Sequence, residues 1–195
     1  MTITSIGIIG AGTMGNGIAQ VAASAGYDVV LLDVSDAALE KGLAALSNSL
    51  DRLIKKEVMN AEQKSQTLAR IKTTTHYADL AQVSLVIEAA TENQAIKESI
   101  LQQVDQVVSK DAIIASNTSS ISITHLGSRN SRPERFIGIH FFNPPPLMAL
   151  IEVIMGKQTS PETLKAVLAM ARAWAKSPLP YKARLALWSI ASFYR

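Results

Sequence analysis

Three glycines, Gly10, Gly12 and Gly15, constrain the fold of this chain more than any other feature. They lie between an apolar, β-rich run at Ile6–Ile9 and residues 14–25, where apolar positions recur at helical spacing. Glycines at this spacing permit a tight turn, the close approach of a pyrophosphate and the packing of a helix on a sheet. A second buried-strand pattern follows at 28–33. The first 33 residues are therefore predicted to form a βαβ unit with parallel strands and a right-handed crossover.

An acidic residue follows this motif where a dinucleotide site needs one. Asp33 ends the second predicted strand, close to the spacing of about 20 residues at which a carboxylate accepts both ribose hydroxyls. Its negative charge would repel a 2′-phosphate, so we predict NAD rather than NADP as the cofactor. The alternatives are a purely structural glycine turn and a surface carboxylate at a strand end.

The rest of the chain alternates strand and helix patterns, which predicts an α/β, doubly wound and mainly parallel sheet. Ser35 or Asp36 can cap a long helix to about Met59, and residues 60–70 form its return partner in a helical hairpin. The further strands are expected at 71–75, 85–88, 113–115, 136–142 and 150–155, and the further helices at 93–109, 122–126 and 161–176.

Composition excludes several classes of function. The formal net charge is only +3, without a broad basic face, so nucleic acid is not an expected partner. The absence of cysteine excludes disulfides, a thiol nucleophile and thiolate metal ligands, and no metal site is expected. No signal peptide is recognisable and no segment approaches the roughly 18 apolar residues of a membrane span, so we expect no membrane association and a cytoplasmic location.

Three downstream motifs carry a family likeness. They are S-N-T-S-S at Ser116–Ser120, F-I-G-I-H-F-F-N-P at Phe136–Pro144 and L-I-E-V at Leu150–Val153. With the glycine loop they resemble the 3-hydroxyacyl-CoA dehydrogenase family over residues 3–178. The resemblance implies a Rossmann NAD-binding domain at 1–178 and an acyl-CoA substrate. It also implies NAD-dependent oxidation of (S)-3-hydroxyacyl-CoA to 3-oxoacyl-CoA in fatty-acid or related metabolism.

Oxidising a secondary alcohol requires a base for the hydroxyl proton while a hydride leaves carbon for the nicotinamide. His140 is the natural base, and the resemblance pairs it with Glu152. The resemblance also gives Ser119 a hydrogen bond to the substrate oxygen and places Asn143 beside the nicotinamide and substrate. Each residue has a structural alternative: a core histidine, a solvated glutamate, a serine that only caps the helix at 122–126, and a rigid proline turn at 143–146.

Two further sets of binding residues follow mainly from the resemblance. The expected cofactor contacts are Gly10, Gly12, Thr13, Met14, Gly15, Asp33, Glu92, Lys97, Asn117, Ser119 and Asn143. Ser49 and Lys56 match family positions that bind coenzyme A, and Arg52 lies one helical turn from each of them, although an ordinary solvated helix face remains possible. His76 and His125 lie in no motif and are expected to be structural or surface groups.

Residues 179–195 depart from the family pattern. The family continues with a segment like S-P-G-F-V-V-N-R, whose asparagine contributes to the active site, and then with a helical domain that pairs its subunits. Permissible codons for Ala183–Arg195, when read from the third base of the first codon, translate as S-P-G-F-V-V-N-R-I-L-L-P. We therefore expect a frameshift tail in place of the helical domain, with the family homodimer interface lost. The alternative is a genuine short C-terminal helix.

Three functional hypotheses follow. The first is the dehydrogenase, and the second is a fragment that binds NAD with little or no turnover. The third is another β-hydroxyacid dehydrogenase, which is disfavoured because those enzymes generally use a lysine base on a helix.

Overall fold

A computed structural model describes residues 2–148, 150–175 and 184–188. The predicted βαβ unit is present as β1 (Ser5–Ile9), α1 (Thr13–Ser24) and β2 (Asp28–Leu32), and β1 and β2 are parallel neighbours. The elements that follow are α2 (Asp36–Lys55), α3 (Ala61–Ala69), β3 (Ile71–Thr74), the 3-10 helix η1 (Tyr77–Leu80), β4 (Leu85–Glu88), α4 (Gln94–Val107), β5 (Ile113–Ser116), α5 (Ile123–Ser128), the 3-10 helix η2 (Pro133–Arg135), β6 (Phe136–Phe141), β7 (Leu150–Met155), α6 (Pro161–Ala175) and β8 (Arg184–Trp188).

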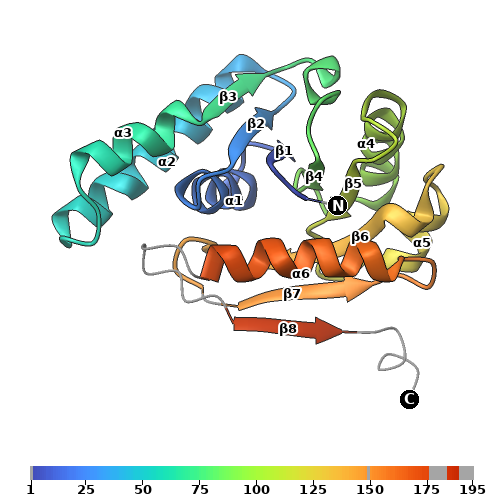
Figure 1. The fold of residues 1–195 in the computed structure, drawn as a ribbon. Helices are drawn as coiled ribbons and strands as arrows, with labels where there is room; N and C mark the ends of the chain where they lie inside the picture. The colour runs from blue at the N-terminus through green and yellow to red at the C-terminus, as the bar shows by residue number, and fades with distance from the viewer. Residues whose placement is uncertain (1, 149, 176–183, 189–195) are drawn as a thin grey trace.

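The strands form one sheet across the described part of the chain, in the order β3-β2-β1-β4-β5-β6-β7-β8 (Figure 1). The first six strands of that order are parallel, β7 is antiparallel to β6, and β8 is parallel to β7. From β1 the chain builds the sheet outward on one side through β2 and β3, and from β4 it builds outward on the other side through β5 and β6. The direction of strand addition therefore reverses between β1 and β4. The predicted Rossmann topology is thus confirmed.

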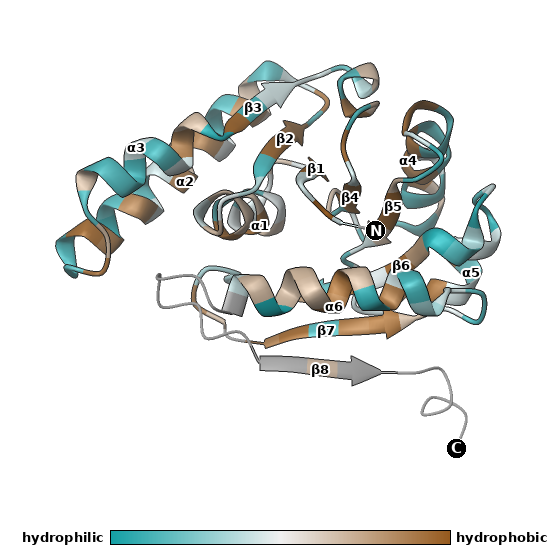
Figure 2. Ribbon diagram, viewed as in Figure 1, coloured by the Kyte–Doolittle hydropathy of each residue, from teal (hydrophilic) through white to brown (hydrophobic). Residues whose placement is uncertain are grey.

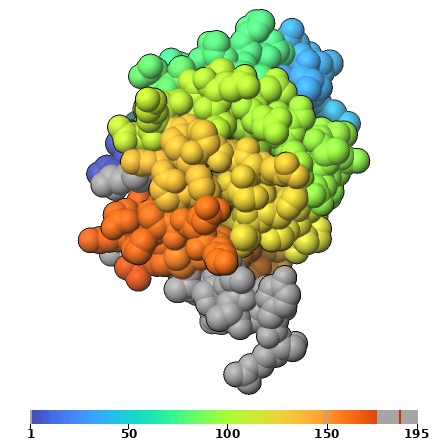
Figure 3. Space-filling view, turned by 90° about the vertical axis from the view of Figure 1, so that its right-hand side faces the viewer, coloured from blue at the N-terminus to red at the C-terminus, as the bar shows by residue number. Residues whose placement is uncertain are grey.

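Helices cover both faces of the sheet because the strands are apolar on both sides. Helices α1, α2 and α6 pack on one face, where Ile18, Leu46 and Trp174 join the strand side chains in a single buried cluster. The other face is covered by η1, α4 and α5, through a second cluster that includes Leu80, Leu101 and Leu126. In the hydropathy colouring, β4, β5 and β7 are mainly brown, whereas α2, α3, α4 and α5 carry teal, hydrophilic stretches (Figure 2). Seen from the side of α4 and α5, these helices form one continuous surface (Figure 3).

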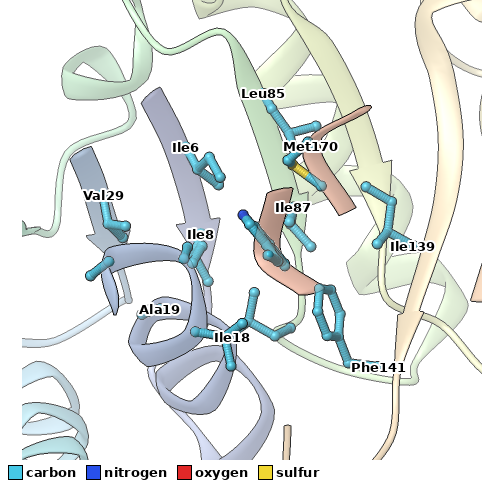
Figure 4. Packing of buried hydrophobic residues seen from close by; sticks show 14 of the residues in the cluster. Ile6, Ile8, Ile18, Ala19, Val29, Leu85, Ile87, Ile139, Phe141 and Met170 are labelled. Atoms are coloured by element: carbon cyan, nitrogen blue, oxygen red, sulfur yellow. The ribbon is translucent and has the colours of Figure 1, made fainter. Parts of the chain in front are cut away.

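The larger cluster is packed by interdigitating aliphatic side chains of neighbouring strands (Figure 4). Ile6 and Ile8 of β1 lie between Val29 of β2 and Ile87 of β4, and Ile18 of α1 covers them. Deleting side chains from such a core typically costs several kcal/mol, because the cavity that remains is only partly refilled. The carboxyl ends of the strands, and the loops that follow them, therefore rest on a rigid base.

Two predictions about the elements are corrected. Helix α2 ends at Lys55 rather than near Met59, because Glu57 adopts a left-handed conformation (φ 57°) and the Val58 N–H bonds to the Leu53 carbonyl at 3.0 Å. Residues 184–188, which the alternative for the tail placed in a short helix, form strand β8 instead. The rest of that tail, 179–183 and 189–195, lies outside the described residues. No helix in the described ranges is long and apolar enough to cross a membrane.

Candidate active site

The glycine loop between β1 and α1 has one glycine that the protein's own packing does not require. A Cβ on Gly10 (φ +100°) would lie 2.7 Å from the Ala90 Cα, and one on Gly15 would lie 1.6 Å from the Gly10 carbonyl oxygen. A Cβ on Gly12, by contrast, would have nothing within 4 Å. The structural-turn alternative explains Gly10 and Gly15 but gives no reason for Gly12. The open space there is what the close approach of a pyrophosphate needs.

The N-terminus of α1 follows the same loop, and no side chain among the described residues caps it. Its N-cap is Gly12, which makes no side-chain capping hydrogen bond, and its first turn carries no acidic residue. The first N–H groups of a helix have no partner within the helix, and the helix dipole favours negative charge at this end. The sequence therefore leaves the backbone of residues 12–14 available to a diphosphate.

Asp33 lies against the glycine loop rather than extending into solvent. Its Oδ2 accepts a hydrogen bond from the Ala11 N–H at 2.6 Å, and its Oδ1 accepts one from the Val34 N–H at 2.7 Å. Sequence reasoning missed Tyr77, whose place on η1 has no motif. Burial, and then the charges of Glu88 and Asp33, raise the pKa of Tyr77. The Tyr77 phenol is therefore neutral near the carboxylate that is predicted to bind the ribose.

Replacing Asp33 with alanine is expected to narrow the preference for NADH over NADPH. The change removes a charged acceptor for the ribose hydroxyls, which corresponds to about a tenfold or greater loss of NADH affinity, and it also removes the repulsion of a 2′-phosphate. Fluorescence titration with each cofactor measures the two dissociation constants, and their ratio gives the preference. Asp36→Ala, which removes an exposed carboxylate from the first turn of α2, is the matched control. Equal affinity of the unaltered protein for both cofactors would contradict the role of Asp33.

His140 and Glu152 form a cross-strand pair. The antiparallel register of β6 and β7 places them directly opposite each other, and His140 Nδ1 lies 2.7 Å from Glu152 Oε2. Their side chains are 18% and 20% exposed, so Glu152 is not a freely solvated residue and His140 is not sealed in the core. With Nδ1 bonded to the carboxylate, Nε2 is the nitrogen that remains for a substrate proton. The pair has the geometry of an oriented base.

The serine turn after β5 is fixed by Glu92 and Asn117. Glu92 accepts hydrogen bonds from the Thr118 hydroxyl at 2.8 Å and the Ser119 N–H at 3.3 Å. Asn117 Oδ1 accepts one from the Phe141 N–H at 2.8 Å, which ties the turn to β6 beside His140. Ser119 is exposed. The alternative that it caps the next helix is wrong, because the α5 cap is Ser122, which accepts from the His125 N–H.

Asn143 follows β6 at the start of the proline turn. Asn143 is exposed, whereas Pro145 and Pro146 are buried. A Cβ on Gly17 of α1 would lie only 2.8 Å from Pro145 Cδ, so this glycine lets the turn pack directly on the helix. The expectation of a turn is confirmed. The position of Asn143 beside a nicotinamide stays a prediction.

A buried polar network at the ends of β4 and β5 contains a residue that the sequence analysis did not select. Glu88 is fully buried, accepts from the Ala90 N–H at 2.9 Å and the Ser116 hydroxyl at 3.0 Å, and forms an ion pair with Lys97. The sequence feature that could have indicated Glu88 is its position as the one charged residue at the end of the otherwise apolar strand L-V-I-E. Lys97 is itself 1% exposed. Its ammonium therefore lies beneath the site surface, and its contact with the cofactor stays a prediction.

The residues expected to bind coenzyme A lie at the C-terminal end of α2. Ser49 is half-buried, Arg52 is exposed, and Lys56 is exposed as the C-cap residue. His125 bonds to Glu98 at 2.8 Å and His76 is exposed, as expected for structural and surface groups. Among the described residues, no group of three or more histidine, aspartate or glutamate side chains could hold a metal ion.

The fold and the loops at the carboxyl ends of its strands define a class: a Rossmann domain that binds a dinucleotide and carries a histidine–glutamate pair on β6 and β7. Residues 5–184 match the family model described as "3-hydroxyacyl-CoA dehydrogenase, NAD binding domain", and the chain belongs to this family. The family description confirms NAD as the cofactor of the domain.

Similar proteins agree with this assignment. The chain is 50% identical over 164 residues, 84% of its length, to a 3-hydroxybutyryl-CoA dehydrogenase from Bradyrhizobium diazoefficiens. It is 47% identical over 89% of its length to a probable 3-hydroxybutyryl-CoA dehydrogenase from Deinococcus radiodurans. The crystal structure of (S)-3-hydroxybutyryl-CoA dehydrogenase from Ralstonia eutropha matches 96% of this chain with a TM-score of 0.91 and 52% identity. The matches span 56%, 62% and 64% of the respective relatives.

Proposed function

We propose that this domain serves the reversible, NAD-dependent oxidation of (S)-3-hydroxyacyl-CoA to 3-oxoacyl-CoA in a complete enzyme. The observation that carries the proposal is the His140–Glu152 pair, which is joined at 2.7 Å and partly exposed. His140 lies on β6, and β4 and β5 separate this strand from β1, which leads into the glycine loop. A base of this kind is what alcohol oxidation requires. The names of the relatives, which include 3-hydroxybutyryl-CoA dehydrogenases, support the substrate class.

The residues of the chain divide the reaction between them. When bound, NAD supplies the chemistry by accepting the hydride from the hydroxyl-bearing carbon. His140 Nε2 takes the hydroxyl proton. Glu152 accepts a hydrogen bond from the Nδ1–H of His140, which fixes the tautomer and stabilises the imidazolium that forms. Ser119 donates a hydrogen bond to the substrate oxygen, and the Asn143 amide orients the nicotinamide and substrate. In the reverse direction His140 returns the proton to the oxygen.

We further propose that the tail at 179–195 results from a frameshift at Ala183, and that the 195-residue chain by itself binds NADH with little or no turnover. The support is the translation S-P-G-F-V-V-N-R-I-L-L-P that permissible codons for Ala183–Arg195 give in a shifted frame. Titration of NADH, followed by acetoacetyl-CoA, distinguishes the hypotheses. Binding with oxidation of NADH supports an active dehydrogenase, binding alone supports the fragment, and the absence of binding contradicts both.

Lys56→Ala is expected to weaken CoA-ester binding several-fold at about 0.05 M salt and much less at about 0.5 M, because ions screen a phosphate contact on an exposed helix end. Calorimetric titration at both salt concentrations measures the effect. Lys41→Ala, another exposed lysine of α2, is the matched control. A loss of affinity that does not depend on salt would indicate packing rather than charge.

A further inference from the structure

Gly42 lies in the second turn of α2 and is buried against Ala11 of the glycine loop. A Cβ at this position would lie 2.7 Å from the Ala11 carbonyl oxygen and 3.0 Å from the Ala11 Cβ. Because the nearer atom belongs to the backbone, a side chain here would have to displace either the helix or the loop. Glycine is unfavourable in a helix interior, so α2 itself offers no reason for it.

The helix has little freedom to move away. It begins three residues after Asp33, and its N-cap Ser35 accepts a hydrogen bond from the Ala38 N–H at 3.3 Å. Further along, Leu39, Leu46 and Leu50 are buried in the larger core cluster. Close-packed interiors transmit such a displacement rather than absorb it. A side chain at position 42 would therefore be accommodated mainly by the loop.

The displaced part of the loop is the part that determines cofactor recognition. The Ala11 N–H donates the 2.6 Å hydrogen bond that holds the Asp33 carboxylate, and the next residue is Gly12, which faces the open space at the N-terminus of α1. A shift of Ala11 would therefore change both the position of the Asp33 carboxylate, which is proposed to bind the ribose, and the space available to the pyrophosphate at Gly12.

We infer that Gly42 is a positioning residue for the dinucleotide site. Its lack of a side chain lets α2 hold Ala11 where the loop can receive the diphosphate and Asp33 can receive the ribose. The inference rests on the cofactor-binding half of the proposed function and is independent of the substrate.

The test is NADH and NADPH titration of the 195-residue chain carrying Gly42→Ala. The NADH dissociation constant is expected to rise at least about tenfold, as for the loss of one hydrogen bond to a charged group. NADPH affinity is expected to fall less, because its recognition does not use the Asp33 carboxylate. The ratio of the NADPH to the NADH dissociation constant should therefore fall, whereas a loss of packing alone would leave this ratio unchanged.

The matched control is Gly26→Ala at the opposite end of α1. Gly26 has φ +94°, so alanine strains the backbone there, but its Cβ would have nothing within 4 Å. Urea denaturation measures the stability loss of both variants, and Gly26→Ala is expected to keep the NADH affinity of the unaltered chain. If Gly42→Ala does not fold, Ala11→Val tests the same contact from the loop side, with the same expected rise.

An unchanged NADH dissociation constant in the folded Gly42 variant, or in Ala11→Val in its place, overturns the positioning role. An equal rise in Gly26→Ala also overturns it, since general loosening would then suffice. Failure of the unaltered chain to bind NADH would contradict the proposed function instead.

Discussion

His140→Gln is expected to lower dehydrogenase turnover by about 10²–10⁴-fold, the usual contribution of a positioned general base. NADH affinity should be retained, because the histidine lies on β6 whereas the glycine loop follows β1. The measurement belongs in a protein that carries the family's C-terminal segment and turns over acetoacetyl-CoA. Glutamine is close in size and polar, but it cannot take the proton.

The partner and a matched control make this experiment specific. Glu152→Gln should also remove most turnover, because it disturbs the tautomer and the imidazolium that the 2.7 Å contact supports. The double variant should be little worse than either single variant, as for residues that act as one unit. His125→Gln changes a histidine that is paired with Glu98 outside the site, and it should keep turnover. Unchanged turnover in either single variant would refute the dyad.

Restoring the reading frame is expected to produce the second large effect. If one base is inserted before the last base of the Ala183 codon, that last base becomes the first base of the following codon. A gene with the permissible codons would then encode S-P-G-F-V-V-N-R and the domain beyond it. The gain in acetoacetyl-CoA reduction over the 195-residue chain should be at least about 10²–10³-fold, since the loss of a single active-site hydrogen-bond donor has a cost of this order. NADH binding should change little.

Sequencing the coding DNA is the direct check on this proposal. Codons for residues 183–195 that do not permit the shifted translation would end it. Full dehydrogenase activity in the unaltered 195-residue chain would equally contradict it. The control is the insertion of one base within the codon of Arg195, which leaves residues 183–194 unchanged. This insertion should not raise acetoacetyl-CoA reduction.

Local patterns predicted most of the fold and the residues that belong to motifs. Strand β4 lies at the predicted residues 85–88, and the loop glycines and Asp33 come together as expected, because strand periodicity and glycine spacing are properties of short segments. Glu88, Tyr77 and Gly42 were missed for a common reason. Their importance depends on neighbours from distant segments, such as Lys97 beneath Glu88 and Ala11 against Gly42, and no short window of sequence contains both members of such a contact.

The order of the strands separates two tasks that an engineer would want to change independently. Asp33 follows β2 and His140 lies on β6, with β1, β4 and β5 between them. At about 4.8 Å per strand this separation is on the order of 19 Å, well beyond the roughly 7–10 Å within which substitutions commonly influence each other. In the chain without a bound dinucleotide, changes in the free energy of unfolding at the two places should therefore add. On the roles proposed for Asp33 and His140, libraries for cofactor preference and for proton transfer can be screened separately and then combined.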